Sequence, residues 1–171
     1  MIEIYTDGAC SSLDYTGGWA MIAINCGNME YFNTTQTPGI GLINQHGIKV
    51  GGAQNTTNNR MELSAIEAAM NFTANETEEP VTIYTDSAYI ANCFKDRWYI
   101  RWEQNGWRTA KKTPVEHQDL WQSILSAYRS AENRISVQHV KAHATNEYNN
   151  LADQCAVSAR QAVREHLATQ E

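Results

Sequence analysis

The sequence lacks any apolar run that approaches the roughly 20 residues needed to cross a membrane. Its first residues, Met-Ile-Glu-Ile-Tyr-Thr-Asp, also lack the basic start and apolar stretch of a secretory signal. Proline is scarce, and the hydrophobic share of 42% is typical of a globular protein rather than a disordered one. We therefore expect a single α/β domain over residues 1–171, located in the cytoplasm and without membrane contacts.

Cysteine is also sparse and widely spaced. The four cysteines are Cys10, Cys26, Cys93 and Cys155, and no two of them form a C-x-x-C pair. Neither a zinc site nor a framework of disulfides is indicated by this spacing. Free, buried thiols are the favoured interpretation.

Basic residues are outnumbered, which gives a net charge of −6 and by itself argues against a nucleic-acid partner. The charge is, however, unevenly distributed. Residues 95–112 carry six basic and two acidic side chains, a net +4, so the rest of the chain carries −10. This separation predicts one electropositive contact surface and, elsewhere, an acidic site suited to divalent metal ions.

Hydrophobic patterning predicts alternating strands and helices. Strands are expected at 2–6, 19–25, 47–53, 81–85 and 135–140, with Gly17-Gly18 in the first turn. Helices are expected from Asn59 onward, at 87–94, at about 115–131 and near 147–168. An opening hairpin followed by strand-helix alternation predicts a mixed sheet.

Four acidic residues occupy suggestive places in this scheme. Asp7 ends the first strand, Glu62 opens the first long helix, Asp86 ends the strand at 81–85, and Asp153 lies in the last helix. Carboxylates at neighbouring strand ends would repel one another unless cations neutralised them, and hard oxygen ligands suit Mg²⁺ or Mn²⁺. Two such ions about 3.5–4 Å apart can activate water and stabilise the leaving oxygen of a phosphodiester.

Each acid has an ordinary structural explanation when taken alone. Asp7 and Asp86 could be helix caps or turn residues, and Glu62 could complement a helix dipole. The surrounding motifs change this balance. They are Tyr-Thr-Asp-Gly-Ala-Cys at 5–10, Thr-Thr-Asn-Asn-Arg-Met-Glu-Leu at 56–63, Thr-Asp-Ser at 85–87 and Val-Lys-Ala-His-Ala at 140–144.

Together these motifs resemble the type 1 ribonuclease H family, in the family's order, from residue 2 to about 165. The resemblance implies a ribonuclease H fold, with a mixed five-stranded sheet of three antiparallel and two parallel strands and helices on both faces. It implies an endonuclease that cuts the RNA of RNA–DNA hybrids, leaving 5′-phosphate and 3′-hydroxyl ends. Two Mg²⁺ ions, with Mn²⁺ as a substitute, would be held by Asp7, Glu62, Asp86 and Asp153.

His143 maps onto the family's flexible-loop histidine. A lone histidine after a strand is usually a surface residue, but an imidazole beside a metal site can transfer protons and help product leave. The family more often has glycine where Ala142 stands.

Residues 95–113 resemble the basic handle of bacterial type 1 enzymes, which holds the DNA strand. Trp98, Tyr99 and Trp102 fall on neighbouring helical turns, interleaved with basic residues such as Arg101, Lys111 and Lys112. Contact with phosphates and bases is one interpretation. The other is that the tryptophans pack the handle against the domain and the charges form a solvated face.

Amide side chains can read ribose 2′-hydroxyls in a minor groove, and Asn58 and Asn59 are the candidates. Helix capping is the alternative for one of them. Thr57 and Arg60 would support nearby phosphate and groove contacts. Ala88 and His117 depart from bacterial members, which leaves the fine substrate contacts open.

Residues 26–55 exceed the family's needs and predict an extended loop or hairpin. A monomer is expected. Two competing functions are a non-catalytic hybrid-binding module and a nuclease that acts on DNA.

Overall fold

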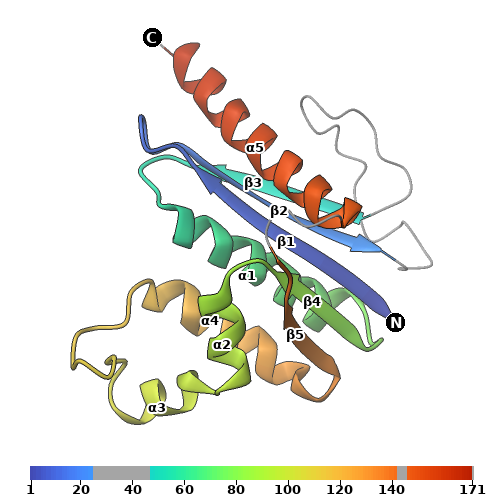
Figure 1. The fold of residues 1–171 in the computed structure, drawn as a ribbon, viewed down its shortest axis with the longest axis vertical. Coiled ribbons are helices and arrows are strands. Elements are labelled where there is room, and N and C mark those ends of the chain that lie inside the picture. The colour runs from blue at the N-terminus through green and yellow to red at the C-terminus, as the bar shows by residue number, and fades with distance from the viewer. Residues whose placement is uncertain (25–46, 142–145, 171) are drawn as a thin grey trace.

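The computed structural model describes residues 1–24, 47–141 and 146–170. A mixed sheet runs through the middle of the molecule in the order β3-β2-β1-β4-β5 (Figure 1). Its strands are β1 (Ile2–Cys10), β2 (Gly17–Ile24), β3 (Gly47–Ala53), β4 (Val81–Thr85) and β5 (Ile135–His139). β1, β2 and β3 pair antiparallel, whereas β4 pairs parallel with β1 and β5 parallel with β4. The expected mixed five-stranded sheet is confirmed.

Helices cover both faces of the sheet, as predicted. They are α1 (Asn58–Glu76), α2 (Ala88–Lys95), α3 (Trp98–Gln104), α4 (Gln118–Ser130) and α5 (Glu147–Ala168), with a 3₁₀ turn at Glu132–Arg134. One core lies between the sheet and α1 to α4, and a smaller one lies under α5. β1 serves both, because alternate side chains of a strand point to opposite faces: Ile4 enters the first core and Tyr5 the second. Among the described residues, no helix has the length and apolarity that crossing a membrane would require.

The first turn differs from its predicted form. Gly17 and Gly18 are the first residues of β2, paired with Cys10 and Ala9, and the turn spans residues 11–16. Glycine is needed at 18 for helix packing, since a Cβ there would lie 2.3 Å from both Ala156 O and Arg160 N of α5. Gly18 therefore marks the close approach of α5 to the sheet, and a Cβ at Gly17 would lie 2.4 Å from Thr56 Cγ2 on the other face, so both glycines mark close packing rather than a turn.

Several element boundaries also differ by a few residues, and three of them are informative. α1 begins at Asn58, one residue early, because Thr57 caps it. α4 begins at Gln118 rather than about 115, since His117 has a left-handed φ of 59° and interrupts the helical path. The predicted strand at 135–140 ends at His139.

The cysteines that the structure describes are free thiols, as expected. Cys93 and Cys155 are buried and Cys10 is half-buried. Burial raises the pKa of Cys93 to about 12 and that of Cys155 to about 11, so both are unreactive at neutral pH. Cys26 and most of the predicted extension at 26–55 lie outside the described residues; its last part is β3 and the segment that leads into α1.

Candidate active site

Asp7 lies in the body of β1 rather than at its end. The strand continues to Cys10 because β2 keeps pairing with it, whereas the parallel pairing with β4 stops at Tyr84. Asp7 is therefore still beyond the end of its parallel neighbour, and the carboxylate is open to α1 and to the residue after β4. Its side chain is 4% exposed, and Oδ1 accepts a hydrogen bond from Gly8 N at 2.8 Å.

Glu62 reaches the same point from the second turn of α1, and it is 7% exposed. The helix can come this close because Gly8, on the opposite face of β1 from Asp7, has no side chain. A Cβ at Gly8 would lie 2.4 Å from Glu62 N and 2.5 Å from Met61 C. The Asp-Gly pair of the first motif thus supplies a carboxylate and the space for the helix that carries the second one.

Asp86 follows β4 directly and completes the group. Ser87, not Asp86, caps α2, with its hydroxyl accepting from Ile90 N at 3.3 Å. The capping explanation for Asp86 is therefore wrong. His139, at the end of β5, donates from Nε2 to the Asp86 carbonyl at 3.3 Å.

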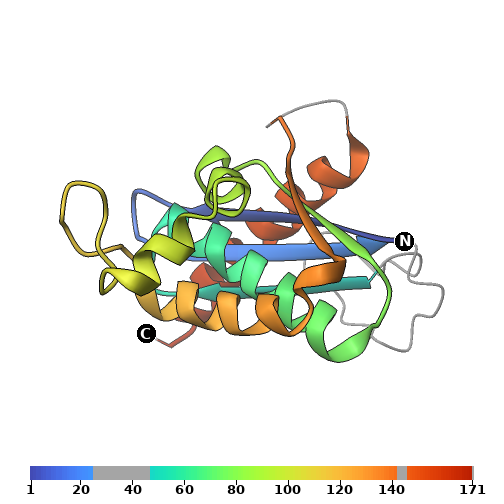
Figure 2. The same ribbon diagram turned by 90° about the horizontal axis from the view of Figure 1, so that it is seen from below.

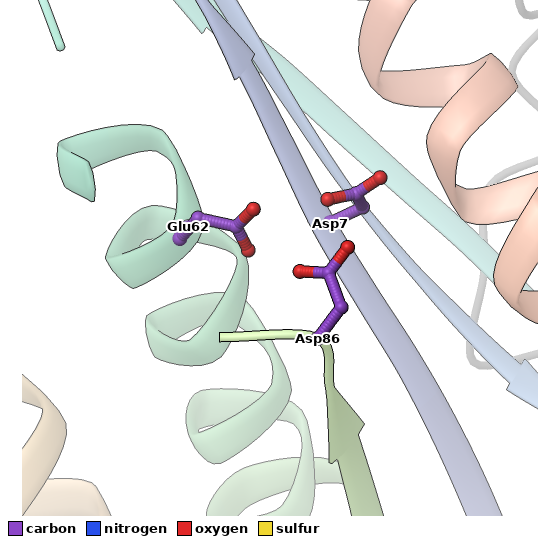
Figure 3. Close-up of side chains that lie close together, drawn as sticks. All are labelled: Asp7, Glu62 and Asp86. Atoms are coloured by element: carbon purple, nitrogen blue, oxygen red, sulfur yellow. The ribbon is translucent and has the colours of Figure 1, made fainter. Parts of the chain in front are cut away.

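Asp7, Glu62 and Asp86 form a compact set of acidic ligands. Each offers a carboxylate oxygen, and these atoms all lie within 4.8 Å of one another. Figure 3 shows the three carboxylates converging from β1, α1 and the end of β4. Asp153, half-buried in α5, lies outside this set of three but close enough to raise the pKa values of Asp7 and Asp86.

Such crowding makes the carboxylates hard to ionise. Burial, followed by the charge of Asp86, raises the pKa of Asp7 to about 7. Burial, followed by the charges of Asp7 and Asp86, raises the pKa of Glu62 to about 10. Asp86 is shifted in the same direction, chiefly by burial. The cluster is electrostatically strained without a cation.

This strain predicts how the metal-free protein responds to pH. In the unfolded chain Asp7 loses its proton near 3.8 and Glu62 near 4.5, whereas in the folded protein both hold it to higher pH. The folded state thus binds more protons over this interval, and its unfolding free energy falls as pH rises. With EDTA, the melting temperature should drop between about pH 5 and about pH 8, and Mg²⁺ should reduce the drop. A melting temperature that rises over this range in EDTA would show that the cluster is not strained.

The donor set fits a hard divalent cation. It consists of carboxylate oxygens, which Mg²⁺ and Mn²⁺ prefer. Oε2 of Glu62 is buried and has no hydrogen-bond partner among the described residues. A buried carboxylate oxygen without a partner is costly, and a bound cation would satisfy it.

Comparison with known proteins decides the family. The RNase H family model matches residues 1–161. The chain belongs to the RNase H family. A ribonuclease H of Thermoanaerobacter sp. (strain X514) is 39% identical over 156 residues, which cover 91% of this chain and 87% of that protein.

Solved RNase H structures share the fold. The solution structure of the PFV RNase H domain matches with a TM-score of 0.70 at 26% identity, covering 94% of each chain. A foamy viral protease-reverse transcriptase in complex with an RNA/DNA hybrid matches with a TM-score of 0.71 at 23% identity. That match covers 93% of this chain and 20% of the viral one.

The start of α1 carries two side-chain amides that are at least partly exposed. Thr57 caps the helix, with Oγ1 accepting from Arg60 N at 3.1 Å. Capping is thus done by Thr57 rather than by Asn58 or Asn59. Asn58 is exposed and Asn59 is half-buried, so both amides remain available for a ligand.

Arg60 also makes contacts within the protein that the sequence did not indicate. Its guanidinium forms two hydrogen bonds with Asp119 of α4, at 3.1 and 2.5 Å, and lies 3.4 Å from His117 Nδ1. The pair joins α1 to α4 and places the imidazole of His117 beside the arginine. Arg60 is thus first a structural link, and any phosphate contact would have to share it with Asp119.

The tryptophans of the handle are largely structural. Trp102 is 6% exposed, and its ring packs edge-on against Trp121 of α4, with centroids 5.3 Å apart. Tyr99 is buried as well, and Trp98 is half-buried against Trp102. These contacts favour packing over nucleic-acid contact for Trp102, and they leave Trp98 as the more accessible ring.

The charges of the handle are outside this aromatic core. Arg101, Lys111 and Lys112 are exposed, while Glu103 is engaged in an ion pair with Arg129 of α4. A hollow of about 550 Å³ lies between the aromatic and basic side chains, and Trp98 and Arg101 are in its wall. The handle therefore presents an electropositive surface with an apolar recess.

Two further polar residues of the structure, Asn149 and His139, were not singled out by the sequence. Asn149 is 4% exposed, and its Oδ1 has no hydrogen-bond partner among the described residues. It precedes Asp153 by one helical turn, a spacing that could have drawn attention to it. No spacing in the sequence marks His139, because its contact with Asp86 depends on the register between β4 and β5. Ala88 is exposed at the start of α2, and His143 and Ala142 lie outside the described residues.

Proposed function

We propose that this chain is an endoribonuclease that hydrolyses the RNA strand of RNA–DNA hybrids and leaves 5′-phosphate and 3′-hydroxyl ends. The observation that carries the proposal is the set of converging carboxylates of Asp7, Glu62 and Asp86, in a chain matched by the RNase H family along residues 1–161. A binding module would gain nothing from such an arrangement, because it costs stability.

The acidic residues would bind the metal ions, and a histidine near them would transfer protons. Asp7, Glu62 and Asp86, with Asp153 from α5, would hold two Mg²⁺ ions, with Mn²⁺ as a substitute. Ions bound there would supply an activated water and stabilise the leaving 3′ oxygen. The carboxylate oxygens of Asp7, Glu62 and Asp86 converge on one region, and once ionised they would balance the positive charge of the bound ions. His143, on the segment before α5, would carry protons to or from the reacting groups and help product leave.

Substrate recognition would come from two surfaces. Thr57, Asn58, Asn59 and Arg60 would face the minor groove and its phosphates, with the two amides reading 2′-hydroxyls. The handle at 95–113 would hold the DNA strand through Arg101, Lys111 and Lys112, with Trp98 at the edge of its recess. Trp102 would support this surface from beneath. We also propose that residues 1–171 form one domain and act as a monomer in the cytoplasm, where free thiols persist.

Substrate competition tests the proposal. Labelled hybrid is incubated with Mg²⁺ alone, and then with excess unlabelled hybrid, RNA duplex, DNA duplex or single strands. Only unlabelled hybrid is expected to suppress cleavage efficiently. The amides would read 2′-hydroxyls of the RNA strand and the handle would hold the DNA strand, so only a hybrid can occupy both surfaces. Suppression by DNA duplex, with cleavage of that duplex, would favour the DNA nuclease instead.

Replacing Lys111 and Lys112 together by glutamine should weaken hybrid binding in a salt-dependent way. The slope of log K against log salt is negative, and each lost phosphate contact makes it shallower by about 0.9. The slope of the double variant should therefore be shallower by nearly twice that amount. Dissociation constants measured in EDTA at several salt concentrations give the slope. Lys49→Gln, which removes a charge paired with Glu76, is the control and should leave it unchanged. An unchanged slope in the double variant would remove both lysines from the interface.

A further inference from the structure

The end of β4 is held by side chains as well as by its neighbouring strands. The parallel pairing of β4 with β1 stops at Tyr84, whose carbonyl accepts from Thr6 Oγ1 at 2.8 Å. On the other side, the register of β4 with β5 ends where Thr85 lies opposite His139. Asp86 is the next residue, and Figure 3 shows its carboxylate at the point where the strand stops. The position of this carboxylate therefore depends on what holds the chain just beyond β4.

The peptide group that joins Asp86 to Ser87 has a partner at each end. Its carbonyl accepts from His139 Nε2 at 3.3 Å, and its N–H donates to Thr85 Oγ1 at 3.1 Å. Thr85 is fully buried, so its hydroxyl is a well-fixed acceptor. Because a carbonyl can only accept, Nε2 must carry a proton, as it does in one neutral tautomer and in the imidazolium ion. The bond from His139 can therefore form whether the ring is neutral or charged.

These two hydrogen bonds restrain the direction of the Asp86 side chain. A peptide group is planar, so fixing both its carbonyl and its N–H prevents rotation about the Cα–C bond of Asp86. The Cα–Cβ bond then points in one direction, toward Asp7 and Glu62, whose carboxylate oxygens lie within 4.8 Å of that of Asp86. Like charges repel, so a backbone restraint opposes the tendency of Asp86 to turn away before a cation binds.

We propose that His139 is a positioning residue for the metal site, whose hydrogen bond to the Asp86 carbonyl holds the Asp86 carboxylate in place for Mg²⁺. The inference rests on the proposed function, in which Asp86 binds the metal, and it adds a residue that acts through Asp86 alone. His139 is exposed, so water competes for this bond and the bond contributes little to overall stability. Its effect on metal binding is larger, because groups that orient a metal ligand typically change the metal affinity by about tenfold or more.

Three substitutions separate this role from that of an ordinary polar residue at a strand end. His139→Leu removes the donor, whereas His139→Gln keeps an N–H donor at a similar distance from the backbone. Gln138→Leu is the matched control on the same strand. Gln138 is also exposed, its Nε2 donates to Ser136 Oγ at 2.7 Å, and it points to the opposite face of β5 from His139.

Hydrogen exchange of the Ser87 amide tests the restraint without any metal. In EDTA, exchange at Ser87 should be about fivefold faster in His139→Leu than in the wild type, because the peptide has lost one of its two partners. His139→Gln and Gln138→Leu should exchange at the wild-type rate. All three variants should melt near the wild-type temperature, since each change is on the surface.

Magnesium binding tests the consequence. The dissociation constant of Mg²⁺, measured by calorimetric titration without hybrid, should rise about tenfold in His139→Leu. It should stay close to the wild-type value in His139→Gln and in Gln138→Leu. With saturating Mg²⁺, His139→Leu should keep the wild-type KM for hybrid, because the residue contacts the site through Asp86 and not the substrate.

An unchanged Mg²⁺ dissociation constant in His139→Leu would overturn the proposal. Equal weakening in His139→Gln would also overturn it, because the hydrogen-bond donor would then not be the cause. A much lower melting temperature in EDTA for His139→Leu than for Gln138→Leu would give His139 a general structural role instead. Because Mg²⁺ binding is measured without hybrid, a wild-type protein that binds Mg²⁺ but cuts no hybrid would reject the proposed function and still test the role of His139.

Discussion

Asp86→Asn should lower the rate of hybrid cleavage on the order of a thousandfold or more, because it removes a charge that stabilises ions and the developing charge of the reaction. The amide has nearly the same shape as the carboxylate, so the position after β4 should not move. Initial rates with labelled hybrid and Mg²⁺ measure the effect. Glu132→Gln, an exposed acid in the 3₁₀ turn, is the matched control and should keep the wild-type rate.

The same variant should raise stability in the absence of metal. One fewer carboxylate in the cluster lowers the repulsion that raises the pKa values of Asp7 and Glu62. In EDTA the melting temperature of Asp86→Asn should therefore exceed that of the wild type, and Mg²⁺ should stabilise the variant less. Loss of activity together with a lower melting temperature would indicate damage to the fold instead of loss of a ligand.

Gly8→Ala should be the most disruptive small substitution near the site. The added methyl group would lie 2.4 Å from Glu62 N and 2.5 Å from Met61 C, and helix backbone cannot move aside as a side chain can. Overpacking of this kind costs about 1–3 kcal/mol, and here it would also push Glu62 away from Asp7. We expect a lower melting temperature and a higher Mg²⁺ concentration at half-maximal rate.

The comparison for this prediction is Gly106→Ala. A Cβ at Gly106 has open space around it, so the only cost is the positive φ of 77°. Its melting temperature should fall less, and its Mg²⁺ dependence should stay that of the wild type, because Gly106 is remote from Glu62 in the handle. Equal Mg²⁺ dependence in Gly8→Ala and the wild type would show that the close approach at Gly8 does not position Glu62.

Much of the acidic site could be predicted from sequence because its parts are local. Asp7, Asp86 and Glu62 are each fixed by the strand or helix that carries them, and short motifs mark those elements. The length of β1 could not be predicted in this way, since it depends on pairing with β2 across a turn. The purpose of Gly8 and Gly18 was also hidden, because each makes room for a helix distant in the sequence.

The aromatic residues show where periodicity stops being informative. Trp98 and Trp102 recur at a helical spacing that fits either a nucleic-acid surface or a core. Trp102 packs against Trp121, which belongs to another helix, so its burial could not be deduced from the spacing alone. Thr57 illustrates a smaller ambiguity, since three adjacent polar residues could each have capped α1.

The most direct test of the account is the fate of each strand of a hybrid in Mg²⁺ and in EDTA. Hybrids labelled on the RNA or on the DNA are incubated with the wild-type protein, and the ends of the products are identified. We expect cleavage of the RNA alone, fragments with 5′-phosphate and 3′-hydroxyl ends, and no cleavage in EDTA. Hybrid that is bound but left intact with both Mg²⁺ and Mn²⁺ would contradict it and identify the protein as a binding module.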